Sequence, residues 1–437
     1  MYSGLLACLL LAATPGGAQE RFSLDALVQR TLEENYQLQI VQNQQQMAEN
    51  MNTAGNAGML PSVALTGERS WEIQTTEANL FTGETRSGEN ALSTGFNAMV
   101  AVDWLVFDGF SMFARRDRLG HLAALGRLDA KYFVEQTVSD LARIYYRLIM
   151  EQNLLASYRQ SLEVSAFRLA LEDRKRQVGA GSALLYQQAL MDHNADSALV
   201  VDQQMLVRDY QMQLNRIINR DPRLPLVPEQ DTIVPQGIEP GERLLELALA
   251  NSRELQRAHL EEMLAEAGTR VERGARYPEL SLFGSYGYSR QTSELGIIES
   301  AQSRGTRFGL RVRFNLYDGG RQNTRVDNAL LEQQSAGLQH QDMRAWLEAD
   351  LLRLRSRHEA LSTQLQLMQQ SLAAARQSLA IAREQLQTGA INGYEFRQTQ
   401  LAALRVENQR TQLLFVIKAI EIDIQRLSGT LLEGLMG

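Results

Sequence analysis

The residues that most often carry chemistry in proteins are few in this chain and far apart in its sequence. Five histidines are scattered over the predicted helices, without the short spacings that bring metal ligands together: His121, His193, His259, His340 and His358. The single cysteine is Cys8, and there is no phosphate-binding loop, nucleophile elbow or zinc signature. We therefore predict no catalytic residue, no metal site and no cofactor, and we do not expect an enzyme.

Composition and charge exclude several other classes of protein. Charged residues make up 22% of the chain and the formal net charge is −7, so no basic field for nucleic acid is expected. A hydrophobic content of 44% excludes a disordered chain. A short apolar run that ends at Gly16-Gly17-Ala18 predicts a signal peptide over residues 1–18. Two alternatives stay open there: lipidation of Cys8, or a wrong start codon, because Met1–Gly4 carries no positive charge.

Short motifs occur twice in the chain, at a constant distance. Asp108-Gly109 follows an aromatic residue in the first half, and Asp318-Gly319-Gly320 does so in the second, an offset of 210 residues (318 − 108). Gly179-Ala180 and Gly389-Ala390 keep the same offset. Two copies in one order and at one spacing indicate an internal duplication.

Each copy is predicted to follow the order helix, strand, strand, long helix, helix, which gives an α+β fold. The first repeat, 19–220, is expected to hold strands at about 62–74 and 94–107, a long helix at 109–178 and a helix at 182–219. A proline-rich linker at 221–242 leads to the second repeat, 243–437, with strands at 279–292 and 304–317 and helices at 319–388 and 392–428. One helix is expected from Phe22 to about Met59, and a polar loop from Thr75 to Ser93.

One chain cannot provide partners for all of its predicted strand edges and helix faces. Four strands in an open sheet leave two unpaired edges, which lipid does not tolerate, and about eight strands are needed to close a small membrane barrel. No segment after the leader reaches the ~18 consecutive apolar residues of a membrane helix, so membrane entry would have to use strands. Leucine heptads along 319–388 predict a coiled-coil helix on the order of 100 Å long that also needs neighbours. Several copies are therefore expected to assemble.

These features together resemble the TolC-type outer-membrane efflux proteins, over nearly everything after residue 18. The resemblance rests on the two strand-to-helix turns, the Val-Gly-Ala-Gly and Thr-Gly-Ala-Ile breaks between long and short helices, and the central prolines. It implies a homotrimer in the cell outer membrane, with a 12-stranded barrel of four strands per chain above a periplasmic α-helical coiled-coil barrel. It also implies a passive exit duct, docked by a periplasmic adaptor (membrane fusion) protein and an inner-membrane pump.

The resemblance assigns a periplasmic gate to residues after the second helix break. Positions of acidic gate residues in the family match Glu395 and Gln398, and only Glu395 is acidic here. The family's arginine and first-repeat aspartate, whose contacts hold the closed state, match Ile391 and Leu185, which are both apolar. Any closing contact would therefore be built differently, for example by apolar packing. A solvated helix glutamate is the alternative for Glu395.

Two further sets of residues follow from the predicted architecture. The exposed turns around Gly179, Gly181, Gly389 and Asn392 would meet the adaptor, or are simple helix breaks. Three arginines share the polar face of the last strand, which would be the barrel lumen: Arg307, Arg311 and Arg313. They would favour anions unless Glu68, Glu72 and Asp103 cancel their charge.

The cargo is not specified by the sequence, and export of small molecules by efflux or of proteins by type I secretion both remain open. A protein of another class is the alternative: a periplasmic coiled-coil scaffold that transports nothing and whose strands form a soluble sheet.

Overall fold

The computed structural model describes residues 21–79, 81–294 and 298–436, so the predicted signal peptide and Cys8 lie outside the described residues. Most of the described chain is helical, with one large sheet. In chain order the elements are β1 Arg21–Phe22, α1 Leu24–Glu34, α2 Tyr36–Met51, β2 Ser62–Asn79, β3 Thr85–Asp108, α3 Ser111–Gln177, α4 Ala183–Ile217, β4 Val227–Pro228, α5 Gly241–Asn251, α6 Arg253–Gly274, β5 Glu279–Ser293, β6 Ser300–Arg313, α7 Arg321–Thr388, α8 Gly393–Leu427 and α9 Leu431–Met436.

The chain forms two compact units, and each draws on both halves of the sequence. The sheet unit comprises residues 42–129 and 256–343, and the helical unit comprises the residues up to 41, 130–255 and 344 onward. The long helices α3 and α7 each contribute residues to both units. Compact units therefore do not coincide with the two sequence repeats.

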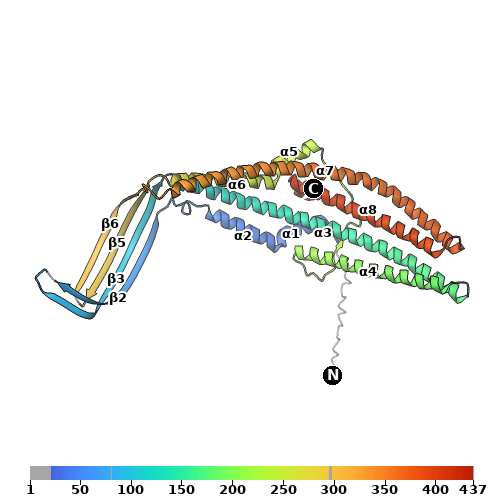
Figure 1. Ribbon diagram of the computed structural model, residues 1–437, viewed down its shortest axis with the longest axis horizontal. Coiled ribbons are helices and arrows are strands. Elements are labelled where there is room, and N and C mark those ends of the chain that lie inside the picture. Colours follow the sequence, from blue (N-terminus) through green and yellow to red (C-terminus); the bar gives the residue numbers. More distant parts are fainter. Residues whose placement is uncertain (1–20, 80, 295–297, 437) are drawn as a thin grey trace, which may run out of the picture. The chain divides into compact units, whose positions relative to one another are not determined.

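The sheet unit holds four antiparallel strands in the order β2-β3-β5-β6 (Figure 1). The register pairs Leu65 with Val100, Val100 with Tyr286, and Leu282 with Leu310, so apolar side chains of all four strands share one face. That face is exposed in the chain: Leu65 is 78% and Phe308 82% accessible. The opposite face carries serines and charged residues. The sheet therefore has one apolar face and one polar face.

The strands differ from the predicted ones at both ends of the sheet. Residues 75–93 were expected to be a loop, but β2 continues to Asn79 and β3 begins at Thr85, because backbone hydrogen bonds form regardless of side-chain polarity. The fourth strand was expected to reach residue 317 and instead ends at Arg313. Arg313 pairs with Glu279, and the preceding residue on that side is Pro278, which has no N–H to extend the ladder.

The first predicted helix is also divided. Asn35 adopts an extended conformation between α1 and α2, and its side-chain oxygen accepts hydrogen bonds from the backbone N–H groups of Gln37 and Leu38. Its amide donates to the carbonyl of Ile217 in α4. Ser252 separates α5 from α6 in the second half and likewise accepts from Leu255. An asparagine or serine that caps the next helix thus interrupts each of these segments.

The two strand-to-helix turns use the same local chemistry. Asp108 accepts a hydrogen bond from the backbone N–H of Met112 at 2.9 Å, and Asp318 accepts one from Gln322 at 2.9 Å. Each aspartate therefore satisfies a free N–H group at the start of a long helix. The glycine after it has a positive φ, +67° at Gly109 and +75° at Gly319. These requirements account for the repeated Asp-Gly pair.

The helical unit is held by apolar side chains along its helices. The first cluster joins α1, α3, α4 and α8 around the fully buried Tyr145 and Leu141. A second joins α5, α7 and α8 around Leu347 and Ile420. Each such side chain contributes about 1.5–3 kcal/mol when it leaves water. Among the described residues no helix combines the length and apolarity that crossing a membrane requires.

The two equivalent glycines give a matched test of the turns. A Cβ on Gly109 would lie 2.1 Å from the carbonyl oxygen of Gly274, whereas a Cβ on Gly319 meets nothing within 4 Å. We expect Gly319→Ala to lower the free energy of unfolding by about 1–2 kcal/mol, from the left-handed backbone alone. Gly109→Ala should cost about 1–3 kcal/mol more, because the backbone must move. Denaturant titration followed by circular dichroism measures both, and equal losses would contradict this account of the turn.

Candidate functional site

Both hairpins of the helical unit turn through the same glycine motif. After α3, Gly179 has φ +76° and donates to the carbonyl of Arg176, while Ala180 donates to that of Lys175. After α7, Gly389 has φ +77°, and Gly389 and Ala390 repeat these bonds to Leu386 and Gln385. This paired bonding is the Schellman motif, which satisfies the last carbonyl groups of a helix. The glycines of the predicted adaptor turns are thus helix terminators, and both are exposed.

The short helices after these turns begin with side-chain caps. Ser182 accepts a hydrogen bond from Leu184 at the start of α4. Asn392 accepts from Tyr394 and Glu395 at the start of α8, and the Glu395 carboxylate accepts from the backbone N–H of Asn392 at 3.1 Å. This reciprocal pair is a capping box. The predicted gate residue Glu395 therefore has a structural partner, although it stays exposed, as does Gln398.

The two apolar positions of the predicted gate lie in different surroundings. Ile391 packs beside a small cluster formed by Ala382, Leu386 and the fully buried Phe396. Leu185 is half-buried on the first turn of α4 and is not part of that cluster. Gly181, at the position that corresponds to Ile391, has its backbone against the end of α3, because a Cβ there would lie 2.6 Å from the nitrogen of Arg176.

Ion pairs connect the two hairpins close to these turns. Arg397 of α8 makes two hydrogen bonds to the Asp196 carboxylate of α4, at 2.7 and 2.8 Å, and its Nε lies 3.6 Å from Asp192. Asp192 also accepts from Arg168 of α3 at 2.5 Å. Arg397 is 11% and Asp196 only 1% accessible. We refer to these four residues as the inter-hairpin ion network.

The carboxylates around Arg397 favour the charged form of its guanidinium. Burial by itself would lower the pKa of Arg397, but the hydrogen bond and charge of Asp196, with the charge of Asp192, raise that pKa above its ordinary value. Gly393 faces Arg168, where a Cβ would lie 3.2 Å from Nε. The guanidinium of Arg168 therefore lies against α8 at a position that carries no side chain.

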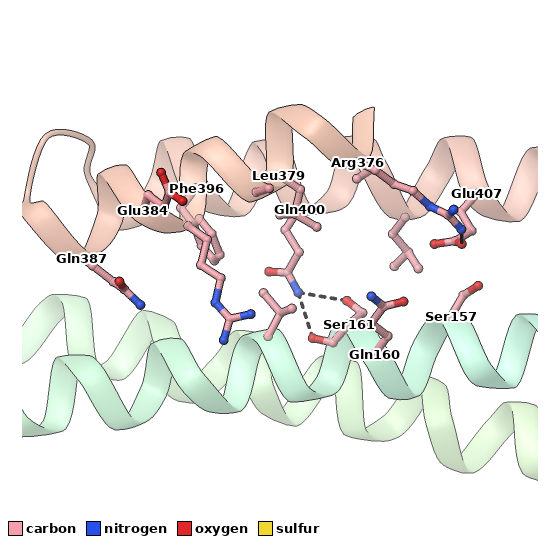
Figure 2. Close-up of a pocket in the computed structure, with 15 residues that line it drawn as sticks. Ser157, Gln160, Ser161, Arg376, Leu379, Glu384, Gln387, Phe396, Gln400 and Glu407 are labelled. Atoms are coloured by element: carbon pink, nitrogen blue, oxygen red, sulfur yellow. Dashed lines mark hydrogen bonds and ion pairs between the residues drawn. The ribbon is translucent and has the colours of Figure 1, made fainter. Parts of the chain in front are cut away.

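A groove continues from the network between the hairpins. It is a pocket of about 600 Å³, lined by α3 on one side and by α7 and α8 on the other. Figure 2 shows Gln400 of α8 reaching across to Ser161 of α3, where its amide donates to both the carbonyl and the hydroxyl oxygen at 2.9 Å. Arg376 and Glu407 pair at one end of the groove. The groove wall thus combines charged and polar side chains with apolar ones such as Leu379 and Phe396.

Sequence reasoning missed the inter-hairpin ion network. It anticipated a closing contact without ions at Ile391 and Leu185, whereas the structure has ionic contacts at other residues of the same region. One signal was available. Asp196 and Gln203 follow Ala189 at intervals of seven residues along α4, and all three are buried. A charged residue at a heptad seam position indicates a buried partner on another helix.

The sheet unit carries the three predicted lumen arginines, all exposed on the polar face of β6. Arg307 and Arg311 lie over the ring of Phe283 from either side, at 5.7 and 5.0 Å. Gly309 between them leaves room for that ring, because a Cβ there would lie 2.8 Å from it. Arg311 also lies 3.9 Å from Asp103, and Arg313 lies 3.7 Å from Glu279. Acidic side chains thus partly balance two of the three charges.

The histidines are less scattered than their spacing indicated. His259 and His340 are 81 residues apart (340 − 259), yet their rings lie 5.3 Å from one another, with Glu262 between them. The two histidines lie on different helices, but α6 and α7 pack side by side. The expectation that the histidines are far from one another was therefore wrong for this pair. His358 instead contacts Glu421 at 3.4 Å within the helical unit.

The network can be tested by removing its shared cation. Arg397→Gln leaves the buried Asp196 carboxylate without its cation, and such a change costs about 3–5 kcal/mol. Arg176→Gln is the control, because Arg176 pairs with Asp173 on the surface, where a pair contributes about 0–1 kcal/mol. We expect Arg397→Gln to lower the midpoint of urea unfolding well below that of the control, and Arg397→Gln with Asp196→Asn to recover part of the loss. Equal midpoints for the two single variants would refute a stabilising network.

Comparison with known proteins identifies the second half of the chain. The sequence profile of the family described as "Outer membrane efflux protein" matches residues 244–430. The outer membrane protein OprJ of Pseudomonas aeruginosa is 27% identical over 211 residues, a stretch that covers 46% of this chain and 41% of OprJ. The chain thus matches about two fifths of that relative's length.

Solved structures share the fold over nearly the whole chain. The outer-membrane channel OprN has a TM-score of 0.77 at 17% identity and covers 97% of this chain, which covers 96% of it. The CmeC outer membrane channel of Campylobacter jejuni has a TM-score of 0.76 at 16% identity, with coverage of 93% and 86%. Residues 244–430 therefore match the outer membrane efflux protein family that the motifs resemble, and nearly the whole chain shares the fold of solved outer-membrane channels.

Proposed function

We propose that three copies of this chain form the passive exit duct of an efflux pump or a type I secretion system. In this assembly the four strands of each chain join a 12-stranded barrel in the outer membrane, and the helical units line a tunnel in the periplasm. A periplasmic adaptor and an inner-membrane pump would dock on the helical end. The duct itself carries out no chemistry, so the pump would choose the cargo.

One observation carries the proposal: the sheet combines an exposed apolar face with two unpaired edges. Among the described residues β2 pairs only with β3, and β6 only with β5, so each outer strand has one edge without a partner in that part of the chain. The apolar face includes Val63 and Leu65 of β2 and Leu310 and Val312 of β6, all exposed. In lipid, exposed apolar side chains are favourable, but an unpaired strand edge is not. Pairing β6 of one copy with β2 of the next removes both edges.

The strand lengths fit a bilayer. The shortest strand of the four-stranded sheet, β6, has 14 residues, and a strand tilted by about 45° needs about 9–11 residues to cross the apolar layer. Four strands are too few to close a barrel, because about eight are the minimum. Three copies of four give 12, and an even number of antiparallel strands is what a closed up-and-down barrel requires.

The two helix turns would form the end that meets the adaptor and narrows the duct. Gly179 and Gly389 are exposed, and each keeps its own position in the turn free of a side chain. With three copies around one axis, the three Glu395 carboxylates would face a constriction together and attract cations there. The inter-hairpin ion network lies just inside these turns, so it would resist separation of the hairpins as the end opens.

Assembly and conductance test the proposal directly. We expect the detergent-solubilised mature protein to be a trimer by light scattering and to conduct ions in planar bilayers. Leu310→Lys introduces a charge on the apolar face and should reduce the yield in the outer membrane, at a cost of about 2–4 kcal/mol near the bilayer centre. Ser285→Lys, on the polar face of the neighbouring strand, is the control and should insert normally.

Three results would overturn the proposal of a duct: a monomer without conductance, equal yields of the two lysine variants, or a protein that stays in the aqueous fraction. The last result would favour the soluble scaffold.

The polar-face arginines give a separate test of which side is the lumen. Arg311→Ala with Arg313→Ala leaves Asp103 and Glu279 without their cations. Under a salt gradient the reversal potential should therefore shift in the cation-selective direction. Arg304→Ala removes a charge on the same strand, but Arg304 lies on the apolar face with Tyr288 and should leave the reversal potential unchanged. An unchanged potential in the double variant would place the arginines outside the conducting path.

A further inference from the structure

The pair of histidines brought together by α6 and α7 has the composition of a metal site. His259 and Glu262 lie one turn apart on α6, and His340 lies opposite them on α7. Glu262 Oε2 is 2.9 Å from His340 Nδ1 and 3.7 Å from His259 Nδ1. One ligand atom from each of the three side chains lies within 4.8 Å of the other two.

These separations are close to those around a bound ion. Zinc lies about 2.0–2.2 Å from imidazole nitrogen and carboxylate oxygen, so ligand atoms of a tetrahedral site are roughly 3.3 Å apart. The pair formed by Glu262 and His340 is slightly closer than this, and Glu262 and His259 need to approach by about 0.4 Å. Since all three ligand atoms lie within 4.8 Å of one another, no pair needs to approach by more than about 1.5 Å. His259 is exposed, so rotation of its side chain can supply that movement without disturbing a packed core.

The surroundings leave room for an ion and its solvent. Gly337 faces Glu262, where a Cβ would come 3.4 Å from Oε1, so the carboxylate has space to turn. A pocket of about 510 Å³ adjoins Glu262 between the two helices, lined also by Glu266 and Gly337. Three protein ligands with access to solvent leave a fourth position for water. The exposed side of His259 provides an entry path.

We propose that His259, Glu262 and His340 bind a divalent transition-metal ion of the zinc and copper class. Two imidazoles and one carboxylate suit these ions, whereas magnesium and calcium prefer oxygen ligands alone. The ion would tie α6 to α7 in the sheet unit, in place of the single hydrogen bond between Glu262 and His340. This metal bridge is independent of transport, because none of its residues belongs to the gate, the turns or the polar face of the sheet.

Zinc alone is the probe, with the full mature protein in detergent and no polyhistidine tag. Isothermal titration should give one zinc ion per chain for wild type. His259→Ala is the main variant, because this side chain is exposed and its loss should not prevent folding. It should weaken zinc binding by more than about tenfold, since even the loss of a group behind the ligands costs 10–100-fold. His121→Ala removes a histidine of the same unit outside the cluster and should bind as wild type does.

Stability provides a second readout for the bridge. Zinc should raise the melting temperature of wild type and of His121→Ala, because an ion that binds only the folded state stabilises it. EDTA should reverse the rise, and His259→Ala and Glu262→Gln should show little of it. The proposal fails if wild type binds no zinc at millimolar concentration, or if His259→Ala and His121→Ala bind it equally. Conductance is unaffected by either result, so this test and that of the duct are distinguishable.

Discussion

The unpaired edges of a two-faced sheet are the constraint on which the rest of this protein depends. Hydrogen bonds join β2 to β3, β3 to β5 and β5 to β6, and then the ladder stops on both sides. In water such edges invite aggregation, and in lipid they are prohibitive. The apolar face formed by residues such as Leu65 and Phe308 makes lipid the favourable solvent for the sheet. The proposed trimer is the arrangement that satisfies both requirements with one kind of chain.

In the proposed duct the helical unit would meet a different requirement, because its hairpins would have to hold together and yet separate as the end opens. Apolar clusters join helices of both hairpins, and near the turns Val164 and Leu171 of α3 pack beside Phe396 of α8. The inter-hairpin ion network and the amide of Gln400 add polar contacts there. Buried ion pairs contribute little net stability but require an exact partner, so they fix the register of one helix against another.

The two halves of the chain use the same local devices and differ in what surrounds them. Both long helices start from an aspartate cap and end in a Schellman glycine. Around them the copies diverge. Gly109 is crowded by Gly274, whereas Gly319 is open, and Gly181 lies against its helix where Ile391 packs in an apolar cluster. Local chemistry set by hydrogen bonding is retained in both copies, and packing has adapted to the different neighbours.

Local pattern in the sequence determined the elements, because each depends on residues near one another in the chain. Period-two alternation gave the strand faces, heptads gave the long helices, and the Asp-Gly and Gly-Ala pairs gave the turns. The ends of strands were predicted less well, since Arg313 ends β6 only because its partner strand is preceded by Pro278.

Tertiary structure alone decided the contacts between distant segments. Arg397 meets Asp196, and His259 meets His340, because helices far apart in the sequence pack side by side, and no local spacing encodes which residues then face each other.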